Sequence, residues 1–370
     1  MELHKLQKAM HERGLDAVVA ASPENVLYST GAYIMTQKAL RDRLAYAVFP
    51  QEGEPTFIVC GIELSLAQEE TWISDLRAYV EFQQSPTSML IDVLREKDLA
   101  SAKVGFESRF LPYKYMDELR LELPKMQMDE CGTLFTNLRM YKSPKEIEAL
   151  RWGAKATCDA VMNTFRAAKV GDTEKDLANS ILKALLDAGA QDLEFVILGV
   201  GERSLITHPT PGATAVEPGK VVRVDVGGLF DGYVSDLART VLGPKPTRRQ
   251  VYVLRTLGEI HKEIISRATV GTKFSDLYNH CQAMFEKAGL PFRMPHIGHG
   301  MGVELHEDPM INPLNHNVLE ENMILNIEPL CVDDESESGY HVEDLVLVTK
   351  DGPEILTGSD LDPEPVVIGG

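Results

Sequence analysis

The chain carries an internal repeat at an offset of 100 residues, and this repeat limits the possible folds more than any other feature. The first copy holds Ala168-Lys-Val-Gly171, Asp176-Leu177 and Ala188-Gly189, and the second holds Ala268-Thr-Val-Gly271, Asp276-Leu277 and Ala288-Gly289. Because the matches fall at the start, the interior and the end of one predicted helix, duplication explains them better than chance. Two such units in one domain predict a pseudo-twofold architecture with a functional site between the halves.

Residues 1–131 follow a different pattern, in which short apolar stretches alternate with helix-length ones. The apolar stretches predict strands at Ala17–Ala21, Leu44–Phe49, Thr56–Cys60, Leu76–Val80 and Val104–Phe106. This alternation indicates an α/β domain, assigned to residues 1–135, and no catalytic constellation stands out in it. The next helix begins with a capping box formed by Ser143, Pro144 and Glu146. A second domain is therefore assigned to residues 136–370.

The charge balance excludes some classes of partner. Lys plus Arg number 37 against 56 Asp plus Glu, a net charge of −19, which argues against nucleic-acid backbones and anionic membranes. The N-terminal residues are regularly charged, and no apolar stretch approaches the length of a membrane span. The five cysteines are widely spaced and contain no Cys-x-x-Cys, which is typical of reduced thiols. We therefore expect a cytoplasmic protein.

Two aspartates fall on one predicted β-hairpin. Asp231-Gly232 separates two apolar, β-rich stretches and is a strong signal for a two-residue turn. This turn pairs Asp225 with Ala238 and Asp236 with Gly227, so the two aspartates share one face and Gly227 leaves space opposite Asp236. Two carboxylates on an apolar hairpin are costly unless they are protonated, paired or bound to a metal. A solvated hairpin face explains two aspartates equally well.

Two glutamates strengthen the case for a metal. Glu328 ends the strand-like stretch Asn322–Glu328, and Glu343 lies inside the apolar stretch Tyr340–Val348. The acidic residues between these stretches, 333–339, are typical of a solvated hairpin tip. Glu343 is harder to explain in this way, because charged residues rarely enter apolar strands without a partner.

A loop rich in histidine and glycine adds nitrogen donors. Residues 295–307 contain three histidines, His296, His299 and His306, together with three glycines. Glycine permits close backbone approach, and clustered histidines beside carboxylates favour metal ligands or proton-transfer groups. One histidine with four carboxylates makes a mostly oxygen-donor site that suits Mn²⁺, Co²⁺, Fe²⁺ or Zn²⁺. Two ions bridged by carboxylates can activate one water for hydrolysis of a carbonyl or phosphoryl bond.

These motifs resemble those of the pita-bread metallopeptidases, the family of creatinase, prolidase and aminopeptidase P, and above all its Xaa-Pro dipeptidases. The resemblance covers nearly the whole chain and includes the segment from Arg139 to Ile147 and the ligand motifs in order. It implies an α/β creatinase-like N-terminal domain followed by an α+β pita-bread catalytic domain with an internal pseudo-twofold repeat. It also implies a homodimer and two divalent ions, foremost Mn²⁺ or Co²⁺, with Zn²⁺ or Fe²⁺ as alternatives.

The resemblance also implies roles for individual residues. Asp225 would bind one ion, Asp236 and Glu343 would bridge both, and His299 and Glu328 would bind the second. Glu328 would also be the general base for the bridging water. His208 would contact substrate, His306 would stabilise the tetrahedral intermediate, and His296 would line the pocket.

Three departures from the family pattern flank the predicted pocket. His341 stands in Gly339-Tyr-His-Val-Glu343, where prolidases have an arginine, and histidine cannot reproduce the bidentate fork of arginine. Leu330 replaces the glycine of the usual Glu-Pro-Gly, and the loop before His208 contains Arg203. We assign His341 and Arg203 to substrate binding. The departures leave the preference for proline open.

Three functions remain in view. The first is a dipeptidase or aminopeptidase that cleaves the bond before proline. The second is a hydrolase of a small amide or amidine, of the creatinase or ectoine-hydrolase kind, or a lyase on the same fold. The third is a non-catalytic binding protein, which the intact ligand set disfavours. In each case the expected partner is a small peptide or small-molecule amide rather than a nucleic acid or a membrane.

Overall fold

The computed structural model describes residues 1–358 and 364–369, and the chain divides into two compact units, Met1–Arg139 and Met140–Gly370. The boundary predicted at 135/136 falls inside helix α7 (Gly132–Met140). Among the described residues, no helix is long and apolar enough to cross a membrane. All five cysteines are free thiols in buried positions.

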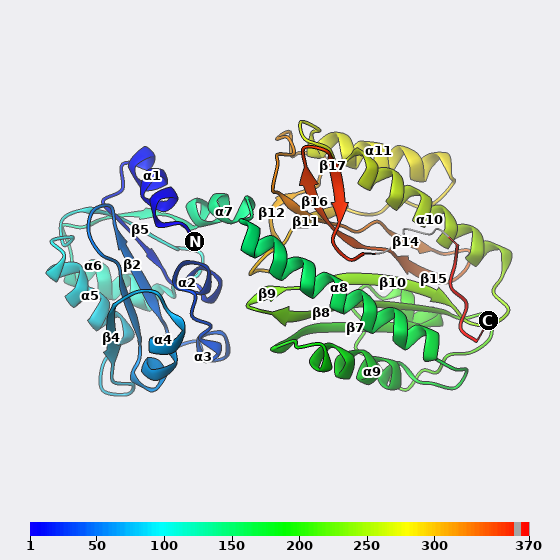
Figure 1. Ribbon diagram of the computed structural model, residues 1–370, viewed down its shortest axis with the longest axis horizontal. Helices are drawn as coiled ribbons and strands as arrows, with labels where there is room; N and C mark the ends of the chain where they lie inside the picture. The colour runs from blue at the N-terminus through cyan, green and yellow to red at the C-terminus, as the bar shows by residue number, and fades with distance from the viewer. Residues whose placement is uncertain (359–363, 370) are drawn as a thin grey trace. The chain divides into compact units, whose positions relative to one another are not determined.

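The first unit is built around a six-stranded sheet with the order β4-β3-β2-β1-β5-β6 (Figure 1). Its strands are β1 (Ala17–Ala20), β2 (Tyr46–Pro50), β3 (Thr56–Cys60), β4 (Asp75–Tyr79), β5 (Lys103–Phe106) and β6 (Gln127–Glu130). The helices are α1 (Leu3–Arg13), α2 (Pro23–Thr30), α3 (Met35–Ala39), α4 (Leu64–Glu70), α5 (Pro86–Glu96), α6 (Tyr113–Glu122) and α7. The predicted α/β class is confirmed. Strand β6 was missed because Gln127-Met-Asp-Glu130 is half exposed at a sheet edge and lacks an apolar pattern.

The second unit contains two larger sheets and two pairs of helices (Figure 1). The first sheet has the order β10-β8-β7, with β9 paired to β8, and the second has the order β12-β11-β13-β16-β17. The first half contains α8 (Pro144–Ala167), α9 (Glu174–Asp187), β7 (Asp192–Val200), β8 (Val221–Phe230), β9 (Tyr233–Val234) and β10 (Leu237–Leu242). The second half contains α10 (Arg248–Arg267), α11 (Phe274–Lys287), β11 (Gly298–Gly300), β12 (Glu307–Met310), β13 (Ile324–Ile327), β16 (Asp344–Thr349) and β17 (Gly352–Ile355). A separate hairpin joins β14 (Leu330–Asp333) to β15 (Ser338–His341).

The internal repeat is visible in the structure. Helices α9 and α11 begin 100 residues apart and end 100 residues apart. Each follows a glycine with positive φ, Gly171 at 98° and Gly271 at 88°. The amide of Gly171 donates to the carbonyl of Val216 at 2.9 Å, and that of Gly271 donates to the carbonyl of Leu319 at 2.8 Å. The predicted pseudo-twofold architecture is therefore confirmed.

Each half buries its own apolar core. Helices α8 and α9 cover β7, β8 and β10, with Phe165, Ile181 and Phe230 fully buried. Helices α10 and α11 pack on the second half, with Leu257 and Phe285 fully buried. Each such side chain contributes about 1.5–3 kcal/mol through burial, so the two cores provide rigid supports for the strands between them. The predicted cap of α8 forms, because the amide of Ser143 donates to the Glu146 carboxylate at 2.9 Å.

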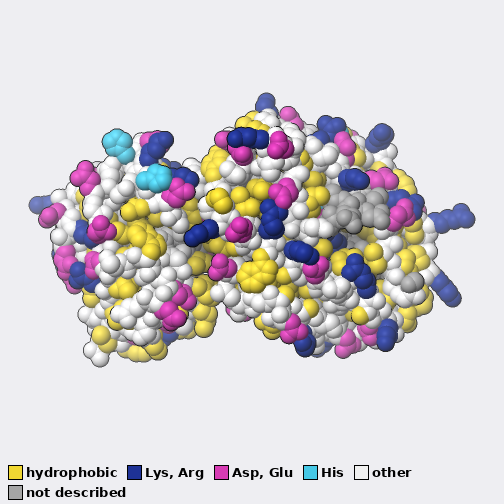
Figure 2. Space-filling model, in the orientation of Figure 1, with side chains coloured by type: hydrophobic (Ala, Val, Ile, Leu, Met, Phe, Trp, Pro, Cys, Tyr) yellow, Lys and Arg dark blue, Asp and Glu magenta, His cyan; other side chains and the backbone are white. Residues whose placement is uncertain are grey.

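Acidic and basic side chains are interspersed over the face of the molecule drawn in Figure 2.

Candidate metal centre

The hairpin that carries the two aspartates has the predicted register. Ala238 pairs with Asp225 in β10 and β8, and beyond them the same register pairs Leu229 with Val234. Asp231 and Gly232 both have positive φ, 50° and 77°, as a type I′ turn requires. The expected space opposite Asp236 is absent, which corrects the sequence interpretation.

Gly227 is occupied by a close backbone approach instead. A Cβ atom at Gly227 would lie 2.1 Å from the carbonyl oxygen of Ser235 and 2.8 Å from the ring of Phe195. Only glycine fits this position, since any side chain would displace the segment that leads to Asp236. The glycine thus fixes the position of Asp236, which lies between β9 and β10.

The other predicted ligands come from the second half of the repeat. His299 is the central residue of β11 and pairs with Asn326 of β13, and Glu328 directly follows β13. Glu343 lies between β15 and β16, and its amide donates to the carbonyl of Ala238 at 3.1 Å. This hydrogen bond joins the second half to the hairpin at Ala238, the residue that pairs with Asp225.

These residues meet at one cavity. His299 Nε2 lies 3.7 Å from Asp236 Oδ2 and 3.6 Å from Glu328 Oε1. Ligand atoms of Asp236, His299 and Glu343 all lie within 4.8 Å of one another, and so do those of Glu328, His341 and Glu343. Two possible cation sites therefore share Glu343. The oxygen Asp225 Oδ2 is 3.7 Å from His341 Nδ1, which places Asp225 beside the second group.

The donor atoms around these two positions are unsatisfied. Buried atoms without a hydrogen-bond partner among the described residues include Asp225 Oδ1, Asp236 Oδ1, His299 Nε2, Glu328 Oε1 and Glu343 Oε2. Such atoms cost free energy unless protons or cations occupy the space between them. The residues therefore fit a pair of divalent cations, and their mixed oxygen and nitrogen donors suit transition metals.

Burial and mutual repulsion shape the protonation of the site. Burial raises the pKa of Asp236 well above its usual range, and the neighbouring Asp225 and Glu328 raise it further. Burial, followed by the charge of Asp236, likewise raises the pKa of Glu343. For Glu328, burial is outweighed by His296, His341 and His299, which lower its pKa. Asp236 and Glu343 are therefore stable in their charged forms only when a cation lies beside them.

His299 is prepared to act as a neutral ligand. Burial lowers its pKa to about 4, so the ring carries no charge near neutral pH. Its Nδ1 lies 2.9 Å from the carbonyl oxygen of Gly300 and must donate to it, which leaves the lone pair on Nε2. That nitrogen faces Asp236 and Glu328, as a metal ligand would.

Metal binding should depend steeply on pH. Because the pKa values of Asp236 and Glu343 are raised, a divalent ion must displace protons from the site. We expect the affinity to fall about tenfold per pH unit for each displaced proton once the pH drops below the raised pKa values of these two carboxyl groups. In the metal-free protein, Asp236 and Glu343 hold protons more tightly in the folded state than in the unfolded state. The free energy of unfolding therefore decreases as the pH rises above the usual carboxyl range.

Titration calorimetry with Co²⁺ in buffers of different ionisation enthalpy measures both the dissociation constant and the released protons. A dissociation constant that does not change with pH would contradict this prediction, as would binding without proton release.

The cavity beside the ligands has a volume of about 640 Å³. It is lined by the four carboxylates and by His208, His296, His306, His341, Arg223, Arg293, Phe195, Ile197, Thr207, Met294, Leu305, Leu330 and Val332. The ring of His306 stacks on that of His299 at 3.9 Å, and His296 Nδ1 lies 3.2 Å from Glu328 Oε1. Burial, with a contribution from His296, lowers the pKa of His306.

Arg203 is not among the residues that line this cavity. Its Nε lies 2.9 Å from the carboxylate of Glu174, which is fully buried, and its Nη2 donates to the carbonyl of Thr210 at 2.6 Å. The guanidinium thus neutralises Glu174 and braces the loop before His208. The sequence assigned Arg203 to substrate binding, but its neighbours in the structure indicate a supporting role.

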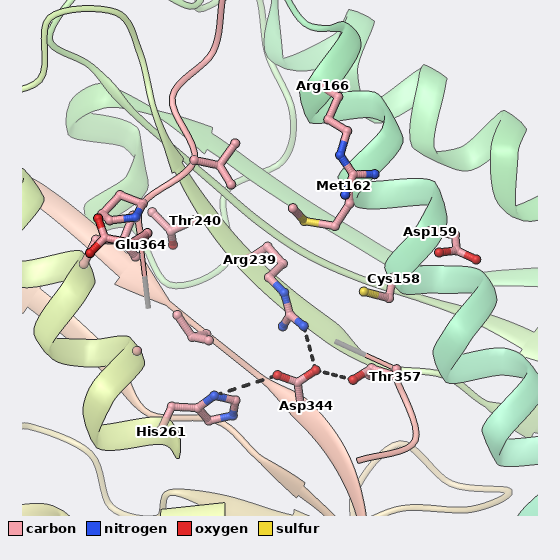
Figure 3. A pocket seen from close by; sticks show the side chains of 16 residues that line it. Cys158, Asp159, Met162, Arg166, Arg239, Thr240, His261, Asp344, Thr357 and Glu364 are labelled. Atoms are coloured by element: carbon pink, nitrogen blue, oxygen red, sulfur yellow. Dashed lines mark hydrogen bonds and ion pairs between the residues drawn. The ribbon is translucent and has the colours of Figure 1, made fainter. Parts of the chain in front are cut away.

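A buried polar network behind the ligands holds their strands (Figure 3). Arg239 donates to the carboxylate of Asp344 at 2.6 Å and also to the carbonyl of Glu343. Thr357 donates to the same carboxylate, and His261 lies 3.8 Å from it. Because His261 Nε2 is also 3.0 Å from the carbonyl of Ile327, the network connects the residues adjacent to both Glu328 and Glu343.

Sequence reasoning missed several of these residues. Arg239 is the single charge in the apolar strand β10, a signal like the one that identified Glu343, and Arg223 lies in the same apolar strand as Asp225. Arg223 also lies two residues before Asp225, so strand alternation alone places both on one face. Asn326, which donates to Glu343 Oε1 at 2.6 Å, carries no charge and gives no comparable signal.

Comparison with known proteins assigns the chain to a family. A model of metallopeptidase family M24 matches residues 148–350, and one of the creatinase/prolidase N-terminal domain matches residues 3–141. The chain therefore belongs to metallopeptidase family M24, and it is a metal-dependent hydrolase with a creatinase-type N-terminal domain. This confirms the resemblance stated from the motifs.

Individual relatives match along their full length. The chain is 29% identical to an Xaa-Pro dipeptidase from Lactobacillus helveticus over 98% of each sequence. It is 26% identical to an Xaa-Pro dipeptidase from Lactobacillus delbrueckii, over 99% of this chain and 100% of that one. Among solved structures, the prolidase from Pyrococcus horikoshii matches with a TM-score of 0.85 and 26% identity, over 97% of this chain and 98% of that one.

Proposed function

We propose that the protein is a dipeptidase that hydrolyses the bond before a C-terminal proline. The observation that carries this proposal is that four carboxylates with unsatisfied donor atoms line a cavity of about 640 Å³, while His299 Nε2 lies 3.7 Å from Asp236 and 3.6 Å from Glu328. Such a cavity is large enough for a dipeptide, and the names of the relatives favour Xaa-Pro substrates.

We assign the metal ligands as the motifs imply. Asp225 would bind one ion, Asp236 and Glu343 would be shared by both, and His299 and Glu328 would bind the second. When bound, the ions would supply an activated water and polarise the scissile carbonyl. Glu328 would accept the proton of the water, because its oxygens face the other ligand atoms.

The histidines that line the cavity handle the substrate. His306 and His208 are exposed to the cavity, and His306 is fixed by stacking on His299. We propose that His306 donates a hydrogen bond to the oxygen that becomes negative during hydrolysis and that His208 contacts the peptide. His296, next to Glu328, would line the same pocket.

Part of the cavity lining is apolar. Phe195, Ile197, Leu330 and Val332 present hydrocarbon side chains to the cavity. A pyrrolidine ring would be desolvated there without losing any hydrogen bond, since the nitrogen of an Xaa-Pro bond has no hydrogen. This feature supports proline after the scissile bond even though Leu330 departs from the usual pattern.

Arg223 favours a substrate with a free carboxylate. Its side chain is only 1% exposed, and its Nε is buried without a hydrogen-bond partner among residues 1–358 and 364–369. Its Nη2 donates to the carbonyls of Ile206 and Thr207, which are neutral groups. A buried guanidinium is a suitable partner for a carboxylate, so we propose that Arg223 binds the C-terminus of a dipeptide.

A substrate panel tests the function. After EDTA treatment and reloading with Mn²⁺ or Co²⁺, the enzyme should cleave Xaa-Pro dipeptides and should cleave Xaa-Pro amides about 10²-fold or more slowly, since the amide leaves Arg223 unpaired. Arg223→Met should abolish this discrimination. Arg293→Gln is the matched control, because Arg293 lines the same cavity but is paired with Asp334 at 2.6 Å.

Other outcomes of the panel select other functions. Turnover of small amides without turnover of any proline dipeptide would reject the proposal and favour an amide hydrolase, which the substitutions at His341 and Leu330 make the second candidate. Failure to bind any divalent metal would instead favour a non-catalytic protein.

We further propose Mn²⁺ or Co²⁺ as the ions, a homodimer and a cytoplasmic location. The metal proposal follows from the oxygen-rich donor set. The location agrees with five free, buried cysteines, because such thiols are typical of reducing compartments. The dimer is implied by the family resemblance and is tested by light scattering.

A further inference from the structure

The surroundings of the His341 side chain differ from those expected of a residue that only lines a substrate pocket. It is the last residue of β15, and its side chain is 3% exposed. Both ring nitrogens are buried and have no hydrogen-bond partner in the part of the chain that the structure describes. A buried imidazole in this state is costly, so its nitrogens require a bound group.

The distances from His341 to the carboxylates identify the kind of group. Its Nε2 lies 3.5 Å from Glu328 Oε2, and its Nδ1 lies 3.7 Å from Asp225 Oδ2. Both distances exceed the roughly 2.7–3.2 Å of a direct hydrogen bond. Two donor atoms that each lie about 2.1 Å from one ion are separated by roughly 3.0–3.5 Å. The Nε2 distance is therefore that of two ligands of the same cation.

Glu328 lies close to both His341 and His299, the histidine already assigned to the metal centre. Glu328 Oε1 lies 3.6 Å from His299 Nε2, and Glu328 Oε2 lies 3.5 Å from His341 Nε2. Each histidine also belongs to one of the two groups of ligand atoms that share Glu343. The two imidazoles therefore occupy equivalent positions, one on each side of the shared carboxylates.

The backbone of His341 is held in place by the hairpin that carries the aspartates. Thr240 of β10 accepts a hydrogen bond from the His341 amide at 2.8 Å and donates one to its carbonyl at 3.0 Å. This pair of bonds fixes the end of β15 over the face that carries Asp225. The imidazole is thus oriented before any ion binds, as a ligand needs to be.

We propose that His341 is a sixth protein ligand, which donates its Nε2 to the cation position formed with Glu328 Oε2 and Glu343, next to Asp225. This inference rests on the two-ion centre proposed above and not on the identity of the substrate. The arginine that prolidases have at this position is always protonated and has no lone pair for a metal, whereas a neutral histidine has one. The substitution thus changes the metal centre itself, beyond the lining of the pocket.

A second nitrogen donor has a measurable consequence. Imidazole favours Zn²⁺ and Co²⁺ over Mn²⁺, which prefers oxygen. With one histidine on each ion, both sites should prefer Co²⁺ to Mn²⁺. Replacing His341 by arginine should return one site to oxygen ligands and lower its preference for Co²⁺.

Metal binding to the EDTA-treated full-length protein tests the proposal without any substrate. Wild-type protein should bind two Co²⁺ per chain, measured by equilibrium dialysis with elemental analysis. His341→Ala should weaken one of them by at least about 10²-fold, since loss of a neighbour of a ligand already costs 10- to 100-fold. The visible absorption of the remaining Co²⁺ should change for one ion only. His208→Ala is the matched control and should retain two ions, because His208 lines the same cavity but belongs to neither group of ligand atoms and, within the described residues, forms no ion pair with a ligand.

Wild-type protein labelled with ¹⁵N-histidine provides a test that does not depend on a variant folding. Addition of Zn²⁺ should shift the ring nitrogens of two buried imidazoles to values typical of metal ligands, and His299→Ala should remove one of the two. A single shifted imidazole in the wild type would overturn the proposal. So would a folded His341→Ala protein, verified by circular dichroism, that binds two Co²⁺ with unchanged affinities and spectrum.

Discussion

Replacing Asp236 by alanine should reduce kcat/KM by about 10³-fold or more and leave the protein with fewer than two metal ions per chain. The carboxylate of Asp236 is 4% exposed, lies 3.7 Å from His299 Nε2 and shares one group of ligand atoms with Glu343. In the proposed bridging role it would contribute to both ions, so its loss would affect the position of each. Glu343→Ala should have the same effect for the same reason.

The experiment compares activity and metal content in one preparation. Metal is measured by elemental analysis after gel filtration, and activity is measured on the best Xaa-Pro dipeptide of the panel. Asp231→Asn is the control, because Asp231 is exposed at the tip of the same hairpin and asparagine tolerates its φ of 50°. Near-normal turnover by Asp236→Ala would refute the bridging role, whereas a loss shared by Asp231→Asn would indicate damage to the hairpin.

His306→Ala should lower kcat by about 10²- to 10³-fold while the protein retains its metal. His306 lines the cavity and stacks on His299, but it belongs to neither group of ligand atoms. The expected loss is therefore that of a hydrogen bond to the developing negative charge. KM should change little, because this bond strengthens only in the transition state.

Two further variants separate this role from packing and from metal binding. His306→Phe preserves an aromatic ring against His299 but has no donor, so it should be as inactive as the alanine variant. His299→Ala should lose metal as well as activity. Loss of metal from His306→Ala would mean that His306 is a ligand, and full activity of His306→Phe would mean that only the stacking matters.

The features that sequence reasoning predicted correctly are those with local causes. The register of the Asp225 hairpin follows from a two-residue turn at Asp231-Gly232, since the turn type fixes every pair in the adjoining strands. The repeat was visible because the same residues recur before, within and at the end of each helix, including Gly171 and Gly271 with positive φ. Glu343 was recognisable as a charge in an apolar stretch, although the single strand predicted over Tyr340–Val348 is wrong, because β15 ends before Glu343 and β16 begins after it.

The features that it predicted incorrectly or missed depend on contacts between distant segments. Gly227 was expected to leave space, but the backbone of Ser235 fills it. Arg203 was assigned to the substrate, but Glu174, in a different helix, pairs with its guanidinium. Neither neighbour can be inferred from periodicity, because a side chain's partner depends on how separate elements pack.

The sequence by itself determined the family, the two halves and the residue types of the metal centre, because these follow from periodicity, turn chemistry and motif order. Only the tertiary structure shows where His341 lies. Strand β15 packs against β8, and His341 exchanges two hydrogen bonds with Thr240 of β10, across 101 residues of chain. A residue that in the sequence only replaced an arginine therefore lies among the carboxylates, at a distance that suits a metal ligand.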